Sequence, residues 1–261
     1  MMDGVSQRWP NLSVAHVGEF ARLDVDRSAR KGVPEVIYAP GKTPAQFLAI
    51  VQTFVREKGL ALASRVDEER RRPVQEWAAA EDLRLWVGHG GAVEIARADY
   101  QPPREAGVVG VLTAGTSDLG VAEEVELVAR HMGCRVISAQ DVGVAGVHRL
   151  LTPLTQMVEA DVDVIVVAAG MEGALASVVA GLVAVPVVGV PVSTGYGLGG
   201  EGVAALYSML QSCSPGLVVV NIDNGVGAGA AAGLIARRAA GKSVAGGAAA
   251  PGAPGAAQVA P

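Results

Sequence analysis

The second half of the chain alternates short valine-rich runs with stretches of helical spacing. After Gly107, five apolar runs have the length of buried strands: 107–112, 134–137, 163–168, 186–190 and 217–222. Helical patterns separate and follow them: about 119–132, 147–160, 173–183, 201–212 and 226–239. Five short strands alternating with helices predict an α/β fold, a doubly wound, flavodoxin-like parallel sheet. Because half the residues are apolar and only 4% are aromatic, we expect a core of Val, Ala and Leu.

Residues 1–100 differ in composition from the rest of the chain and contain all three tryptophans. Thr43-Pro44 predicts the start of a helix that runs to Gly59, and residues 60–63 predict a short strand. Residues 70–81 predict a second helix, with Pro73 in its first turn. We therefore divide the chain into a smaller N-terminal α+β region, a linker, a catalytic α/β domain and a disordered Ala/Gly/Pro tail: 1–100, 100–106, 107–242 and 243–261.

Charge and composition exclude several classes of protein. The net charge of −5 argues against a nucleic-acid binder, and the densest basic run, residues 70–72, directly follows two glutamates. The N-terminus lacks the apolar segment of a signal peptide, and Gly, Pro or Glu interrupt every apolar stretch before it could span a membrane. Two cysteines, Cys134 and Cys213, do not make a disulfide framework, so we expect a cytoplasmic protein.

Two predicted loops follow the first two strands of the sheet, on the rim where doubly wound folds bind ligands. Residues 113–118 (TAGTSD) offer backbone amides, hydroxyls and a helix N-terminus to a phosphate or carboxylate, although Ser117 or Asp118 could simply cap the helix. The second loop delivers Asp141, His148 and Arg149. Arginine binds anions and histidine transfers protons, whereas an isolated histidine is more often structural.

The next two rim loops carry one acid and many glycines. Glu172, in the turn GMEG at 170–173, could stabilise the helix N-terminus, or act as a general base or position a water molecule. Residues 191–200 (PVSTGYGLGG) allow a ligand to approach the backbone closely, although this signal is weak. The common nucleotide-binding fingerprints are absent from the sequence.

The two cysteines receive different interpretations. Cys134 opens a strand and is expected to be buried, whereas Cys213 lies between serines at a Pro-Gly break, where a thiol is accessible. Cys213 follows a helix, and helices of this fold end on the rim opposite the ligand. Either that helix bends back or a neighbouring subunit brings Cys213 into the site. We favour assembly.

With these residues identified, residues 107–242 resemble the PurE superfamily of aminoimidazole ribonucleotide (AIR) carboxylases and mutases. The resemblance lies in three segments: 115–118, Ser138-Ala139 with His148-Arg149, and 178–192. Residues 140–147 split the Ser-Ala-His-Arg motif of that superfamily. Its Ala-His-Leu-Pro segment is replaced by Gly-Ala-Leu-Ala at 173–176, so the second PurE histidine is missing.

Residues 20–240 resemble a closer family, LarB, the pyridinium-3,5-biscarboxylic acid mononucleotide synthases of nickel-pincer cofactor biosynthesis. Six motifs occur in the same order: Asp24-x-x-Arg27-x-x-Arg30-x-Gly32-x-Pro34-Glu35-Val36-Ile37, Gly41-Lys42-Thr43, 113–118, 141–149, 170–175 and Ser212-Cys213. This resemblance implies carboxylation of the pyridinium ring of nicotinic acid adenine dinucleotide, and cleavage of its phosphoanhydride to release AMP.

The resemblance also implies residue roles. Cys213 would be the nucleophile that adds to the ring, Glu172 would activate the hydrolytic water, and Asp118 or Asp141 would remove the ring proton. The expected substrate-binding residues are Thr116, Ser117, Ser138, His148, Arg149, Gly170 and Met171.

The implied co-substrate is carbon dioxide or bicarbonate, with no tightly bound cofactor; Mg²⁺ could assist the anhydride step by neutralising charge. The resemblance further implies a homo-octamer. Two alternatives stay open: a PurE-type ribonucleotide carboxylase or mutase, which needs no thiol, and a non-catalytic nucleotide-binding or assembly module.

Overall fold

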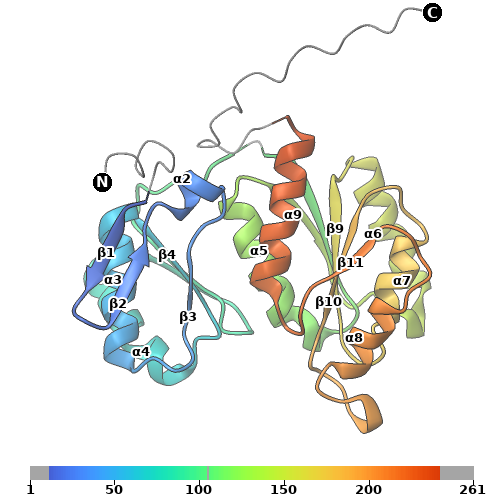
Figure 1. Cartoon of the computed structure of the whole chain (residues 1–261), viewed down its shortest axis with the longest axis horizontal. Coiled ribbons are helices and arrows are strands. Elements are labelled where there is room, and N and C mark those ends of the chain that lie inside the picture. Colours follow the sequence, from blue (N-terminus) through green and yellow to red (C-terminus); the bar gives the residue numbers. More distant parts are fainter. Residues whose placement is uncertain (1–11, 105, 242–261) are drawn as a thin grey trace, which may run out of the picture.

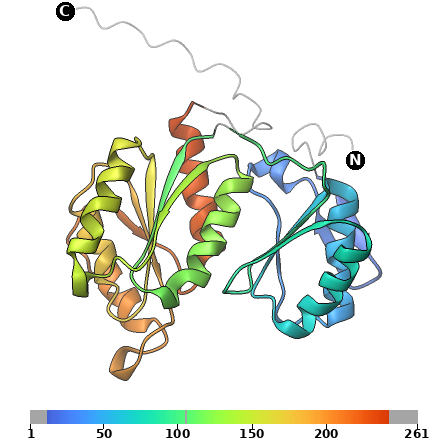
Figure 2. The same cartoon turned by 180° about the vertical axis from the view of Figure 1, so that it is seen from behind.

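The computed structural model describes residues 12–104 and 106–241, which form two lobes (Figure 1). The predicted tail at 243–261 lies outside the described residues. Figure 1 and the view from behind (Figure 2) both place helices α5 and α9 between the sheets of the two lobes. Among the helices of the described ranges, none combines the length and apolar character needed to cross a membrane.

The C-terminal lobe contains a five-stranded sheet in the order β11-β10-β9-β7-β8. Its strands are β7 (Val108–Thr113), β8 (Arg135–Ala139), β9 (Val164–Ala169), β10 (Val187–Pro191) and β11 (Leu217–Val219). All four neighbouring pairs are parallel, which confirms the predicted α/β sheet. Every residue of β9 and β10 is buried, because helices cover both faces of these central strands.

Helices cover the two faces of this sheet (Figure 1). One face packs against α5 (Leu119–His131) and α9 (Gly225–Ala239), and the other against α6 (His148–Glu159), α7 (Ala174–Ala180) and α8 (Val203–Leu210). Short 3₁₀ turns lie in three of the loops: η1 (Thr116–Asp118), η2 (Val144–Gly146) and η3 (Gly197–Gly199). Among the described residues, the core on each face consists of Val, Ala, Leu, Ile and Met, with Cys134 added on the α5 and α9 face and no aromatic side chain.

The N-terminal lobe is a smaller α+β unit. Its strands are β1 (Val14–Val17), β2 (Ala21–Asp24), β3 (Val36–Tyr38), β4 (Leu60–Ser64), β5 (Arg84–Val87) and β6 (Val93–Ala96). The first two form a hairpin, and the others form a mixed sheet in the order β3-β4-β6-β5. Its helices are α2 (Arg27–Lys31), α3 (Pro44–Lys58) and α4 (Glu68–Ala80).

Helix α3 has the predicted ends. The Thr43 hydroxyl accepts a hydrogen bond from the N–H of Gln46, and the Gln46 side chain accepts one from the N–H of Thr43. Gly59 ends the helix in the left-handed conformation. The prediction for α4 was wrong at its start. This helix begins at Glu68, capped by the side chain of Asp67, so Pro73 lies in the second turn and not in the first.

The two lobes approach each other closely near the rim where β7 ends. A methyl group added at Gly90 of the N-terminal lobe would lie only 2.5 Å from the Cα of Gly120 in α5. Beside this contact, Nδ1 of His89 lies 2.6 Å from Oε1 of Glu123. Leu62 of β4 and Leu127 of α5 share a small buried cluster behind it. The N-terminal lobe therefore lies next to the rim of the larger sheet at which β7 ends.

Candidate active site

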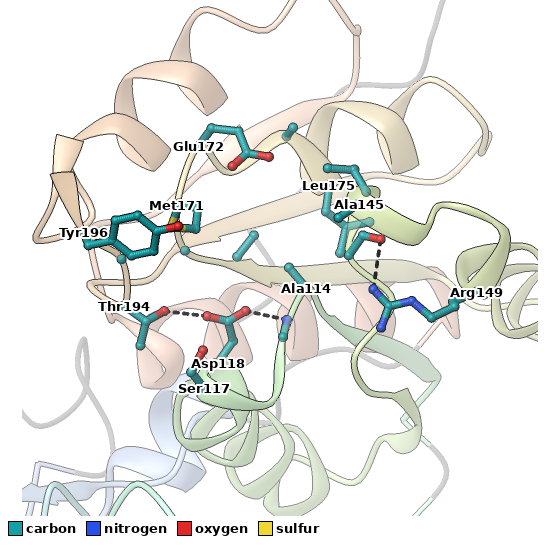
Figure 3. A pocket seen from close by; sticks show the side chains of 17 residues that line it. Ala114, Ser117, Asp118, Ala145, Arg149, Met171, Glu172, Leu175, Thr194 and Tyr196 are labelled. Atoms are coloured by element: carbon teal, nitrogen blue, oxygen red, sulfur yellow. Dashed lines mark hydrogen bonds between the residues drawn. The ribbon is translucent and has the colours of Figure 1, made fainter. Parts of the chain in front are cut away.

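The strand order creates a crevice between β7 and β9. These strands are neighbours, but the chain continues from β7 to β8 on one side and from β9 to β10 on the other. Loops that diverge in this way leave an opening at the carboxyl ends of the strands, the usual ligand site of doubly wound folds. A cavity of about 410 Å³ lies there, lined by the loops that follow β7, β8, β9 and β10 (Figure 3).

Asp118, in the loop after β7, joins two walls of the cavity. Its side chain is buried, with Oδ2 accepting the N–H of Gly115 at 2.8 Å and Oδ1 accepting the hydroxyl of Thr194 at 2.8 Å (Figure 3). Burial raises the pKa of the Asp118 carboxyl, and the hydrogen bonds from Thr194 and Gly115 limit that rise. A buried carboxyl with a raised pKa on a cavity wall is a candidate for proton transfer.

The loop after β9 requires glycine at position 170. A methyl group on Gly170 would lie 2.2 Å from the carbonyl oxygen of Thr194, and that same oxygen accepts the N–H of Met171 at 3.1 Å. Met171 and Gly173 then turn the chain through left-handed backbone conformations. As a result, Glu172 is exposed at the cavity wall opposite Asp118 (Figure 3).

Arg149, at the start of α6, supplies a cation to the cavity. Its Nη1 lies 2.6 Å from Oδ2 of Asp141, and its guanidinium also reaches the carbonyl oxygens of Gly143 and Gly146. Asp141 does not line the cavity. Its carboxylate forms an ion pair with the Arg149 guanidinium instead.

The loop after β10 provides Thr194 and Tyr196, which are not among the predicted site residues. The sequence of this loop indicates only that its glycines allow a ligand to approach the backbone. The contact between Thr194 and Asp118 joins residues 76 positions apart, so no local motif could have predicted it. Tyr196 is 82% exposed at the mouth of the cavity.

The cavity brings together six of the predicted site residues: Ser117, Asp118, Arg149, Gly170, Met171 and Glu172. Five others do not line it: Thr116, Ser138, Asp141, His148 and Cys213. Thr116 lies in η1 beside Ser117, and His148 is an exposed residue at the start of α6.

Cys213 is exposed on the opposite rim of the same chain. Its neighbours Ser212 and Ser214 both hydrogen-bond to Ser177 in α7, and the carbonyl of Gly216 accepts the N–H of Val187, where β10 begins. The cavity lies where β10 ends, so helix α8 does not bend back to bring the thiol into it. Cys134 is buried, which raises the pKa of its thiol to about 11.

Within the described part of the chain, no group of three or more His, Cys, Asp or Glu side chains could hold a metal ion. The chemical groups of the cavity are thus a buried acid, an exposed acid, an arginine, hydroxyls and backbone amides at helix N-termini. Such a set can bind an anionic ligand and transfer protons.

Comparisons with known proteins agree with this architecture. A family model described as a LarB/PurE-like N-terminal domain matches residues 14–82, and one described as AIR carboxylase matches residues 108–248. An uncharacterized protein from Methanocaldococcus jannaschii is 44% identical over 229 residues, which cover 85% of this chain and 86% of that protein. With the parallel sheet and the N-terminal α+β lobe in place, the chain belongs to the LarB family of the PurE/AIR carboxylase superfamily.

Proposed function

We propose that this protein carboxylates the pyridinium ring of nicotinic acid adenine dinucleotide and hydrolyses its phosphoanhydride. The products are pyridinium-3,5-biscarboxylic acid mononucleotide and AMP, in the first step of nickel-pincer nucleotide biosynthesis. Membership of the LarB family supports a carboxylase-type enzyme. The observation that carries the finer proposal is Glu172, exposed on the cavity wall beside Ala174, the position of the missing PurE-type histidine.

Carboxylation needs a nucleophile because a pyridinium ring is too electron-poor to attack carbon dioxide. The Cys213 thiolate adds to ring carbon 4 and forms a C–S bond, which converts the ring into a dihydropyridine whose carbon 5 is an enamine carbon. Carbon 5 then forms a bond to carbon dioxide and loses its proton. Departure of the thiolate restores the aromatic ring.

Assembly supplies the thiol in this proposal. Cys213 lies on the rim opposite the cavity of its own chain, so a neighbouring copy delivers it. We propose a cytoplasmic homo-oligomer, an octamer by analogy with PurE proteins.

Asp118 is the better candidate for the base that removes the ring proton. Asp118 is buried on the cavity wall, whereas Asp141 does not line the cavity and pairs with Arg149. Arg149, Ser117 and the backbone of Gly170 and Met171 would hold the carboxylate and phosphate groups of the substrate.

Glu172 would perform the hydrolytic step. Its carboxylate accepts a proton from water, the water oxygen bonds to phosphorus, the anhydride P–O bond breaks and AMP leaves. Mg²⁺ would assist this step by neutralising the charge of the phosphates.

The decisive experiment incubates the purified protein with the dinucleotide and bicarbonate and analyses the products by mass spectrometry. The expected products are AMP and a mononucleotide that is heavier than nicotinic acid mononucleotide by one carboxylate. Binding of the dinucleotide without either product would contradict the proposal and favour a non-catalytic module.

Two variants separate the steps. Cys213→Ser should abolish carboxylation, and Glu172→Gln should leave a carboxylated dinucleotide that is not cleaved. Glu201→Gln, an exposed glutamate outside the cavity lining, is the matched control and should behave like the wild type. Full activity in Cys213→Ser would refute the thiolate mechanism and favour PurE-type chemistry.

A further inference from the structure

A groove between the two lobes adjoins the active-site cavity. A hollow of about 280 Å³ shares Ser117 and Thr194 with the cavity. A second hollow of about 400 Å³ shares Arg65, Glu124 and Asp223 with the first. The three spaces therefore adjoin one another in a row, from the switch point past Ser117 to the N-terminal lobe. Each hollow has roughly the volume of a small ligand pocket, about 300 Å³.

Arg65 places a cation at the middle of this groove. It follows β4 of the N-terminal lobe, and its Nη2 donates to the backbone carbonyl of Asp223 in the C-terminal lobe at 2.8 Å. The ion pairs found among the described residues do not include Arg65. A guanidinium has five N–H donors, so further donors remain for an anion.

Tyr38, at the end of β3, has the Arg65 guanidinium over one face of its ring and so leaves the other face for a ligand. Its side chain is 53% exposed, and the guanidinium carbon of Arg65 lies 5.9 Å from its ring centroid. Val36, Ile222 and Val226 line the same hollow. An exposed ring next to apolar side chains is suited to stacking with a planar heterocycle.

Two carboxyl groups line both hollows together with the arginine. Oδ1 of Asp223 accepts the N–H of Ser193 at 2.7 Å, while Glu124 is a buried residue of the lining. Burial raises the pKa of Glu124 to about 7, with Arg65 opposing the rise. Carboxyl oxygens of this kind accept hydrogen bonds from the hydroxyls of a sugar.

We propose that this interlobe groove is a second subsite that binds the 5′-mononucleotide half of the substrate, the half released as AMP. Arg65 binds its phosphate, Tyr38 stacks on its base, and Asp223 and Glu124 accept hydrogen bonds from its ribose. The proposal rests on the proposed function for the identity of the substrate. The N-terminal lobe then has a defined role, which is to hold the leaving group while the ring occupies the switch-point cavity.

The test measures binding to the purified full-length protein by calorimetry, with three ligands: AMP, nicotinic acid mononucleotide and the dinucleotide. Arg65→Ala should weaken binding of AMP and of the dinucleotide at least tenfold, and change that of nicotinic acid mononucleotide less than twofold. Arg72→Ala, which removes an exposed arginine of α4 outside the groove, should change none of them.

Further variants guard against a folding defect. Arg65→Lys keeps the charge but loses the planar set of donors, so it should weaken AMP binding by an intermediate factor. Tyr38→Ala should weaken AMP binding several-fold, whereas Tyr38→Phe should retain it because the aromatic face persists. Circular dichroism and a thermal melt should show all variants folded.

The outcomes distinguish this subsite from the proposed reaction. AMP binding that depends on Arg65 supports the subsite even if no carboxylated product forms. Wild-type carboxylation together with an unchanged KM for the dinucleotide in Arg65→Ala would overturn the subsite and leave the reaction standing. Absence of AMP binding to the wild type, or an equal loss for both mononucleotides in Arg65→Ala, would also overturn it.

Discussion

At the scale of single residues, burial raises the pKa of the proposed base, Asp118, and the hydrogen bond from Thr194 limits that rise. That bond lowers the pKa of Asp118 against the raising effect of burial. Thr194→Val removes it, so the pKa of Asp118 should rise and less carboxylate should be present at a given acidic pH. The acidic limb of the pH–activity profile should therefore move to higher pH. Thr152→Val, at an exposed position of α6 outside the cavity lining, serves as the control. An acidic limb that does not move in Thr194→Val would exclude Asp118 as the titrating base.

Glu124 should make stability depend on pH. Its pKa is raised from 4.5 to about 7 by burial, so the folded protein keeps a proton that the unfolded chain has already lost. The unfolded state binds fewer protons between those values, and the free energy of unfolding should fall as pH rises from about 4.5 to 7, by at most about 1.4 kcal/mol per pH unit. Urea unfolding measured across this range should show that slope.

Glu124→Gln removes the titrating group and should flatten this part of the stability profile. Glu57→Gln, at an exposed position near the end of α3, should leave the wild-type slope intact. Equal slopes in the wild type and Glu124→Gln would mean that Glu124 is ionised in the folded protein throughout this range.

The sequence predicted those site residues that lie within a short motif forming a rim loop. Asp118 and Glu172 are examples. It did not predict Thr194 or Arg65, because their roles arise from contacts across the fold. Thr194 acts through a partner 76 positions away, and Arg65 through one 158 positions away. Contacts between residues so far apart in the chain produce no periodic pattern or spaced motif in the sequence.

At the scale of elements, two glycines in the rim loops should respond differently to the same substitution. Gly170→Ala forces a methyl group to within 2.2 Å of the Thr194 carbonyl, so the β9 and β10 loops must separate. We expect a loss of about 1–3 kcal/mol in the free energy of unfolding, together with weaker substrate binding. Gly115→Ala meets its nearest atoms at 3.6 Å and should be tolerated. Urea unfolding and calorimetry check both, and equal stability of the two variants would contradict the packing argument.

The five strands of the larger sheet were predictable because they are β-branched runs buried by helices on both sides. The first four match the predictions to within two residues at either end, while β11 ends at Val219 and not at 222. In the N-terminal lobe only β4 was predicted. The others are three or four residues long and partly exposed, as in β5, so their hydrophobic pattern is too short to stand out.

At the scale of the whole molecule, Cys213 and the cavity must come from different copies of the chain if both serve one reaction. The helix before Cys213 supports such an assembly. Val203, Tyr207 and Leu210 of α8 are exposed apolar side chains, and Leu151 and Val158 of α6 are exposed on the same face of the sheet. Apolar surface of this kind is typical of a subunit interface. Packing of α8 against a neighbouring copy would carry the thiol of Cys213 with it.

Subunit mixing tests this arrangement directly. Cys213→Ser lacks the proposed nucleophile and Arg149→Ala lacks the cavity cation, so each variant alone should form little carboxylated product. Both changes block carboxylation, so a diffusing intermediate cannot rescue the mixture. When the two chains are co-expressed with different tags and mixed oligomers are isolated, about one site in four should combine an intact Arg149 with an intact Cys213 from its neighbour. Activity should therefore reappear at roughly that fraction of the wild-type level.

Variants that are assembled separately and then mixed should stay inactive, because their sites contain only one kind of chain. If isolated mixed oligomers are as inactive as their parents, Cys213 does not reach the cavity of a neighbouring chain.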